Sequence, residues 1–146
     1  MKKLLVLLLL LVSAELAIPP EVIKEPYKRP PSDSECMAVA IHDEARGEPV
    51  KGMRAVLDTI LARMKKRNKT ACEVVLEHKQ FSGMKPYMLF DIPEEIITNY
   101  EKVARLPPVV RGCDYFHATH ASPKWAKEMT ICKQVGKHIF YKEKKK

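Results

Sequence analysis

The sequence predicts a mainly helical α+β domain, and two patterns carry the prediction. Between residues 53 and 64, apolar side chains recur three and four positions apart, which is typical of an amphipathic helix packed on a core: Met53, Val56, Leu57, Ile60, Leu61 and Met64. Later in the chain, residues 114–119 are aromatic, and residues 137–142 alternate and are rich in aromatic and β-branched side chains. We expect these two stretches to pair as a small antiparallel sheet.

Another helix is expected to begin at a capping box formed by Ser32 and Glu35 and to end at Gly47, because glycine favours helix C-termini. Four of its residues follow the spacing i, i+3, i+4 and i+7, namely Met37, Ala40, Ile41 and Glu44. The spacing predicts that a carboxylate lies on the apolar face of this helix.

Two more helices are expected further along the chain. Thr70 and Glu73 form a second capping box, which begins a short helix. Asp91 and Glu94 are expected to cap a longer helix, which the prolines at 107–108 end. Two less regular segments complete the chain: an irregular, groove-lining loop over residues 80–90 and a short helix that begins at Ser122-Pro123.

The ends of the chain are expected to lie outside the folded domain. Two lysines precede the apolar run Leu4–Val12, and small residues follow it, so residues 1–14 are predicted to be a secretory signal peptide. The alternative is an uncleaved anchor, although the run is shorter than the ~20 residues that span a bilayer. Five prolines make residues 15–31 a semi-rigid linker. The domain then covers residues 32–142, with a basic tail at 143–146 and no integral membrane span after signal removal.

The net charge of the chain indicates which kinds of partner it could bind. The formal net charge is +8, which suits a polyanionic surface such as a bacterial wall, although solubility alone would also explain it. Binding to nucleic acid is not expected, because the chain has no recognition motif and carries an export signal. We expect a monomer that is secreted or located in the periplasm or cell envelope.

The four cysteines, Cys36, Cys72, Cys113 and Cys132, predict two disulfides, since their number is even and they follow an export signal. Three pairings are possible, and the favoured one joins Cys36 to Cys72 and Cys113 to Cys132. A metal site built from them is not expected, because no C-x-x-C occurs.

Glu44 is the leading candidate for a catalytic group. A carboxyl on an apolar helix face loses hydration, which raises its pKa and favours the protonated form that a general acid needs. The alternative is a structural ion pair with Arg46 or a lysine. Glu48 directly precedes Pro49 at the start of the next helix, where the helix dipole explains a carboxylate. We therefore expect Glu48 to have a structural or substrate-positioning role.

The histidines do not suggest a metal centre. His117 and His120 are three apart on an expected strand, which places them on opposite faces, and there is no H-E-x-x-H motif. His117 shares a face with Tyr115 and is expected either to contact a sugar or to make a structural hydrogen bond. Trp125 and Phe116 could stack on sugars or belong to the core. We expect no metal and no cofactor.

These residues together resemble a known family. Residues 41–49 (IHDEARGEP), followed by Gly52, Ala55, Val56 and Arg63, are similar to the start of the bacterial and phage cell-wall hydrolases that include the spore-cortex-lytic enzymes. Later blocks agree in order, at residues 72–75, 80–82, 115–117, 123–125 and 136–141. The resemblance covers residues 35–141. The chain departs from the family pattern at Gly83 and at residues 107–113, where loops are expected to touch substrate.

The resemblance implies a lysozyme-like α+β fold and cleavage of peptidoglycan between N-acetylmuramic acid and N-acetylglucosamine. The spore enzymes are similar to lytic transglycosylases that use one glutamate, and that glutamate corresponds to Glu44. The residues expected to hold the sugars are Glu48, Gln80, Tyr115 and His117. Three alternatives remain open, namely hydrolysis by water, a non-catalytic peptidoglycan-binding domain and a zinc amidase.

Overall fold

The computed structural model describes residues 29–77, 81 and 86–145. The predicted signal peptide, most of the predicted linker and Gln80 lie outside the described residues. In the described part the chain forms four α-helices, two short 3₁₀ helices and a three-stranded antiparallel sheet of order β1-β3-β2. The prediction of a mainly helical α+β fold with a small antiparallel sheet is therefore confirmed. No helix among these residues is long and apolar enough to cross a membrane.

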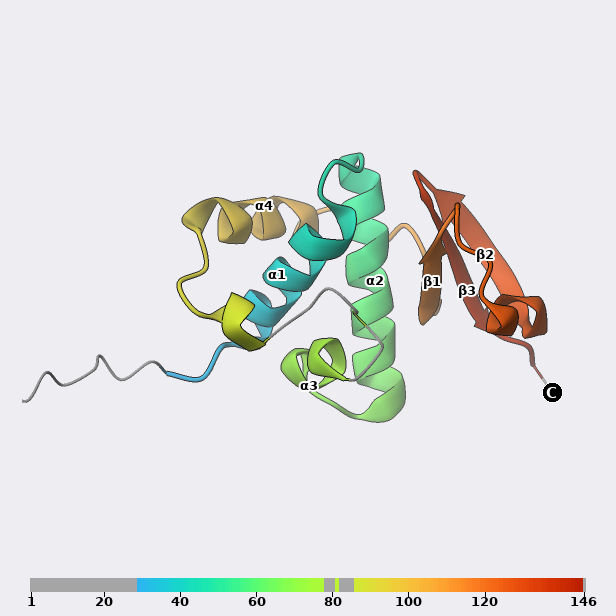
Figure 1. Ribbon diagram of the computed structural model, residues 1–146, viewed down its shortest axis with the longest axis horizontal. Helices are drawn as coiled ribbons and strands as arrows, with labels where there is room; N and C mark the ends of the chain where they lie inside the picture. Colours follow the sequence, from blue (N-terminus) through green and yellow to red (C-terminus); the bar gives the residue numbers. More distant parts are fainter. Residues whose placement is uncertain (1–28, 78–80, 82–85, 146) are drawn as a thin grey trace, which may run out of the picture.

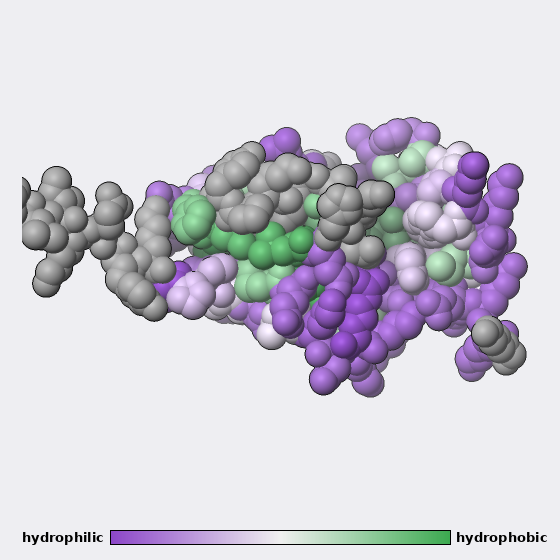
Figure 2. Space-filling model, turned by 60° about the horizontal axis from the view of Figure 1, so that its bottom comes forward, coloured by the Kyte–Doolittle hydropathy of each residue, from purple (hydrophilic) through white to green (hydrophobic). Residues whose placement is uncertain are grey.

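Helix α2 (Val50–Arg67) separates the other helices from the sheet (Figure 1). On one side of it lie α1 (Asp33–Ala45), α3 (Ala71–Leu76), η1 (Pro86–Leu89) and α4 (Glu94–Ala104). On the other side lie β1 (Tyr115–Ala118), η2 (Lys124–Glu128), β2 (Met129–Val135) and β3 (His138–Glu143). Hydrophilic side chains gather over the end of α2 and the start of α3 (Figure 2), where the last turn of α2 is basic.

Helix α1 is the centre of the helical part. Residues 36–41 are all buried, because α1 packs against α2, α3 and α4 at once. The sequence predicted that one face of this helix is buried. The buried surface is wider than that face, because Ala38 and Val39 are buried as well. A helix surrounded on all sides by other helices needs no polar face over its middle.

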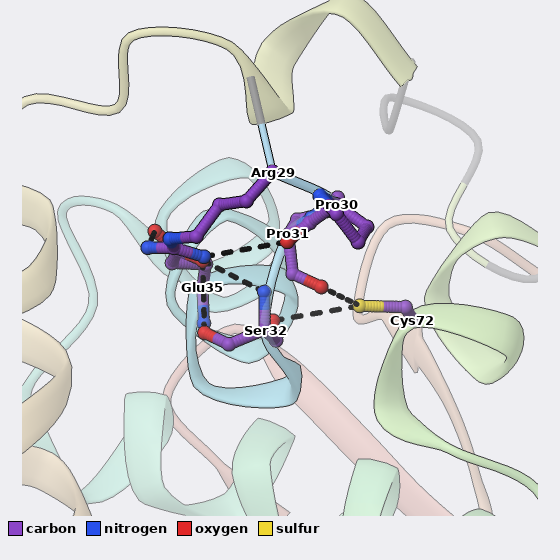
Figure 3. Close-up of polar contacts among 6 residues, drawn as sticks. All are labelled: Arg29, Pro30, Pro31, Ser32, Glu35 and Cys72. Atoms are coloured by element: carbon purple, nitrogen blue, oxygen red, sulfur yellow. Dashed lines mark hydrogen bonds and ion pairs between the residues drawn. The ribbon is translucent and has the colours of Figure 1, made fainter. Parts of the chain in front are cut away.

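The start of α1 is fixed by polar contacts that the sequence predicted in part (Figure 3). Ser32 and Glu35 form the expected capping box. Arg29 adds two hydrogen bonds to the Glu35 carboxylate, at 2.8 and 2.7 Å, and these lower the Glu35 pKa to about 2. Cys36 and Cys72 then join α1 to α3 by a disulfide. The second disulfide joins Cys113 to Cys132, so the favoured pairing is confirmed.

A buried ion pair on α2 holds the segment that leads from α4 to the sheet. The Arg54 Nε donates to Asp58 Oδ1 over 2.8 Å, and Arg54 Nη1 donates to the Ala104 carbonyl over 2.9 Å. Asp58 Oδ2 accepts from the backbone N–H groups of Val109 and Val110, at 2.6 and 3.0 Å. Each charge is thus compensated, which a buried ion pair needs in order to be tolerated.

Three local predictions differ from the structure. The α4 helix begins at Glu94 with Pro93 in the N-cap position, and Asp91 instead adopts a positive φ of 53°. Strand β2 was not predicted. It forms one edge of the sheet, and Ile131 is 63% exposed there, so the strand lacks the alternation of a half-buried strand. Leu61 belongs to the predicted apolar face of α2 but is 39% exposed.

The sheet has two different faces. Tyr115 pairs with Tyr141, and Phe116 pairs with Phe140. Because paired residues point to the same side of a sheet and alternate along a strand, the phenylalanines lie on one face with the core and the tyrosines lie on the other face. His117 shares the second face with the tyrosines. The predicted pairing of the two aromatic stretches is confirmed.

Candidate active site

Glu44 lies in the last turn of α1, where the buried helix reaches the surface. Its side chain is half-buried. The pKa of the carboxyl is raised to about 7, mainly by burial and also by the negative charge of Asp43, while the positive charge of Arg63 acts in the opposite direction. The C-terminal end of a helix dipole also disfavours a negative charge. Glu44 can therefore hold a proton near neutral pH.

The structural alternative for Glu44, an ion pair with Arg46, is absent from the described part of the chain. Arg46 is exposed and caps α1 through its backbone N–H, which donates to the His42 carbonyl. No described residue donates a side-chain hydrogen bond to the Glu44 carboxylate or forms an ion pair with it. A half-buried carboxyl without a partner is the arrangement that general acids use.

Arg63 is the cation whose charge lowers the Glu44 pKa. The sequence did not predict a separate role for it. It is buried on α2, and its Nε donates to the Asp114 carbonyl over 2.6 Å. Its guanidinium lies over the rings of Phe81 and Phe116, at 5.0 and 6.0 Å from their centroids. Burial lowers the Arg63 pKa to about 10, so the side chain stays charged at neutral pH.

The junction between α2 and the sheet contains two buried polar atoms that have no hydrogen-bond partner in the described structure, Arg63 Nη1 and His138 Nδ1. Both side chains border Phe116, because the His138 ring meets it edge-on with centroids 5.2 Å apart. Burial also lowers the pKa of His138. Unsatisfied buried polar atoms are rare and call for a specific explanation, such as a bound water or a functional role. This junction is therefore part of the candidate site.

Glu48 connects the helical part to the sheet. Its carboxylate accepts a hydrogen bond from the backbone N–H of Lys137, in the turn between β2 and β3, at 3.3 Å to Oε1 and 3.1 Å to Oε2. A Cβ on Gly136 would lie 1.9 Å from Glu48 Oε2, so a side chain at this position would displace the carboxylate. These contacts give Glu48 a structural role. Its predicted contact with substrate stays a prediction.

Tyr115 and His117 line a hollow of about 740 Å³ together with Arg63, Phe116 and Trp125. The Trp125 ring packs against the rings of Tyr115 and His117, with both centroid distances at 5.6 Å. A second hollow of about 350 Å³ shares His117 and the segment 121–123 with the first. The two hollows therefore adjoin on the face of the sheet that carries the tyrosines and His117, which we call the aromatic face.

The hydrogen bonds of His117 fix its tautomer. Its Nδ1 lies 2.8 Å from the Ala118 carbonyl, and its Nε2 lies 2.8 Å from the Tyr141 hydroxyl. A carbonyl oxygen can only accept, so Nδ1 carries the hydrogen, and in the neutral ring Nε2 accepts from the hydroxyl. His117 is thus held in place by protein groups, and it lines both hollows.

The described residues contain no group of three or more histidine, cysteine or acidic side chains that could hold a metal ion. His120 follows β1 in a turn rather than extending the strand, so the predicted placement of His117 and His120 on opposite faces of one strand is wrong.

The sequence model of the family described as Cell Wall Hydrolase matches residues 47–141. The chain belongs to this cell wall hydrolase family. The resemblance seen in the sequence is confirmed. Glu44 lies three positions before the matched residues, so its assignment rests on the geometry described above.

Spore cortex-lytic enzymes are similar in sequence to this chain. The chain is 30% identical over 115 residues to the spore cortex-lytic enzyme of Bacillus cereus. The match covers 76% of this chain and 44% of that protein. It is also 30% identical over 115 residues to the spore cortex-lytic enzyme of Oceanobacillus iheyensis, covering 76% of this chain and 42% of that protein. This cell wall hydrolase thus spans less than half the length of the curated relatives that it matches.

Two solved structures share the fold. The catalytic domain of the Bacillus cereus SleB protein has a TM-score of 0.64 and 28% identity, covering 75% of this chain and 89% of that one. The catalytic domain of the germination-specific lytic transglycosylase SleB from Bacillus anthracis has a TM-score of 0.66 and 27% identity, covering 80% of this chain and 99% of that one. The fold of this cell wall hydrolase is therefore that of the SleB catalytic domain.

The contact between Glu48 and the β2–β3 turn predicts a specific response to Gly136→Ala. Gly136 and Gly112 both have positive φ values, 57° and 68°, but a Cβ on Gly112 would meet no atom within 4 Å. Gly112→Ala should therefore lose only about 1–2 kcal/mol of unfolding free energy, the backbone cost of a left-handed residue. Gly136→Ala should lose a further ~0.5–1.5 kcal/mol, because the added methyl group displaces the Glu48 carboxylate from its hydrogen bond with the Lys137 N–H.

Urea denaturation of the two variants measures this difference. If Gly136→Ala and Gly112→Ala lost the same unfolding free energy, the Glu48 contact would not be holding the turn.

Proposed function

We propose that this chain cleaves peptidoglycan glycan strands between N-acetylmuramic acid and N-acetylglucosamine, as a lytic transglycosylase with Glu44 as its single catalytic residue. The observation that supports the proposal most strongly is the half-buried Glu44 carboxyl, whose pKa is raised to about 7, in a chain of the cell wall hydrolase family. The SleB structure of Bacillus anthracis is itself described as that of a lytic transglycosylase.

In the proposed mechanism, the protonated Glu44 donates its proton to the glycosidic oxygen while the bond between that oxygen and C1 of the muramic acid breaks. The C6 hydroxyl of the same sugar then bonds to C1, and the Glu44 carboxylate takes the hydroxyl proton. The product is a 1,6-anhydromuramic end, and Glu44 returns to its protonated form. One acid suffices because the hydroxyl of the sugar replaces water as the nucleophile.

The sugars would be held by the aromatic face of the sheet. Tyr115 and His117 border the hollow of about 740 Å³, and Trp125 adds a large ring to it. Aromatic rings suit the apolar faces of sugars, while the Tyr115 hydroxyl can hydrogen-bond to their hydroxyl groups. We also keep Gln80 and Glu48 as proposed substrate contacts. Glu48 would act mainly by fixing the β2–β3 turn, and no metal or cofactor takes part.

The proposed setting is the cell envelope. Residues 1–14 would direct export, residues 15–31 would link the export signal to the domain at 32–142, and residues 143–146 would form its basic tail. The two disulfides, Cys36–Cys72 and Cys113–Cys132, are consistent with an oxidising compartment. We propose that the protein acts there as a monomer.

Mass spectrometry of the muropeptides released from purified sacculi tests the reaction. We expect anhydro ends, which are one water lighter than reducing ends, and we expect Glu44→Gln to lower the rate at least ~100-fold because the general acid is lost. Glu101→Gln, which changes an exposed acid on α4, is the matched control and should keep full activity. Reducing ends would mean hydrolysis by water, and a wild type that binds sacculi without cutting them would exclude an enzyme.

The pH profile tests the role of Glu44 separately. Because the proton donor must be protonated, kcat/KM should fall as the pH rises through about 7. Asp43→Asn removes a negative charge that raises the Glu44 pKa, so this fall should move to lower pH. The turbidity loss of sacculi between about pH 5 and 9 gives the profile. A profile that does not move in Asp43→Asn would contradict the assignment of Glu44 as the acid.

A further inference from the structure

A second groove lies on another face of α2, away from the face that carries Arg63. It has a volume of about 730 Å³ and runs between α2, the segment before β1 and the end of β3. Its apolar lining includes Leu61, Ala62 and Val110. None of the residues assigned above to catalysis or sugar binding lines this groove, so it is separate from the candidate active site.

The groove is strongly basic. Six cations and three carboxylates line it, which gives a net charge of +3. All three carboxylates are already paired: Asp58 accepts from Arg54, while Asp114 and Glu143 both contact the Lys66 ammonium, at 2.7 and 2.9 Å. The acids of the groove therefore do not neutralise its remaining cations.

Four exposed cations remain around the groove, and no acid in the described part of the chain pairs with them: Lys65, Arg111, Lys142 and Lys145. They come from three separate segments, α2, the connection before β1, and the end of β3 and the residues that follow it. Cations from three segments around an apolar lining suit a ligand that carries several negative charges on a partly apolar chain.

We propose that this groove binds the carboxylates of the peptides on a peptidoglycan strand next to the one being cut. This inference takes its ligand from the proposed function, although it needs binding and not cleavage. The short peptides of peptidoglycan combine free carboxylates with alanine methyl groups, which match the cations and the apolar lining respectively. Contact with a neighbouring strand would keep the enzyme on the wall between cuts.

The test measures binding of the full chain to purified sacculi by co-sedimentation, in the Glu44→Gln background so that the wall stays intact. The double variant Arg111→Gln with Lys142→Gln removes two cations of the groove. The control double variant Lys102→Gln with Lys133→Gln removes two exposed cations that do not line it, so both variants have the same net charge. Thermal unfolding should show that both variants are folded.

We expect the groove variant to bind sacculi about five-fold more weakly, the size expected from losing two exposed ion pairs, and the control variant to bind within about two-fold of the parent. Amidation of the wall carboxylates should abolish the difference between the two variants. High salt should also reduce the difference, because exposed ion pairs are screened.

Several results would overturn the proposal. Equal losses in the two double variants would mean that net charge alone drives binding. A difference that survives amidation but disappears when phosphodiester polymers are stripped from the wall with hydrofluoric acid would identify a phosphate ligand instead. A difference of the same size on phosphatidylglycerol vesicles would identify a membrane surface. Because binding is measured without cleavage, absence of lytic activity in the wild type would contradict the proposed function and leave this test valid.

Discussion

The burial of α1 is the constraint on which the rest of the structure depends. Three helices surround residues 36–41, so the position of α1 is fixed by close packing on all sides. The start of the helix is held by its capping box and by the disulfide from Cys36. Both ends of the helix leave the core, and the partly buried residues of its last turn include Glu44. Burial of the helix therefore determines both where the carboxyl lies and how much water reaches it.

A second contact places the sheet relative to that helix. Glu48 follows the turn at Gly47, which has a φ of 84°, and its carboxylate accepts from the Lys137 backbone in the β2–β3 turn. The disulfide between Cys113 and Cys132 ties the strands further. Glu48 thus ties the turn after α1 to the sheet that carries the aromatic hollow. In the proposed mechanism Glu44 is the acid, whereas Glu48 has a structural role.

Local signals account for the helices that the sequence predicted correctly. Capping boxes at Ser32 and Thr70 and the spacing along α2 depend on neighbours within a few residues, and both boxes form as expected. The missed features depend on distant residues. Arg63 meets the Asp114 carbonyl 51 positions away, and Glu48 meets Lys137 89 positions away. No periodicity encodes such pairs. Strand β2 was missed because its pattern is set by its place at a sheet edge.

NMR titration measures directly whether folding leaves the Glu44 carboxyl partly protonated near pH 7. In protein labelled with ¹³C at the glutamate carboxyl carbons, the Glu44 signal is assigned by its absence in Glu44→Gln and followed from pH 3 to pH 9. We expect a midpoint of about 7, well above the ~4.3 of an unperturbed glutamate. A midpoint at that unperturbed value would contradict the assignment of Glu44 as the general acid, since Glu44 would then be ionised at the pH at which it must donate a proton.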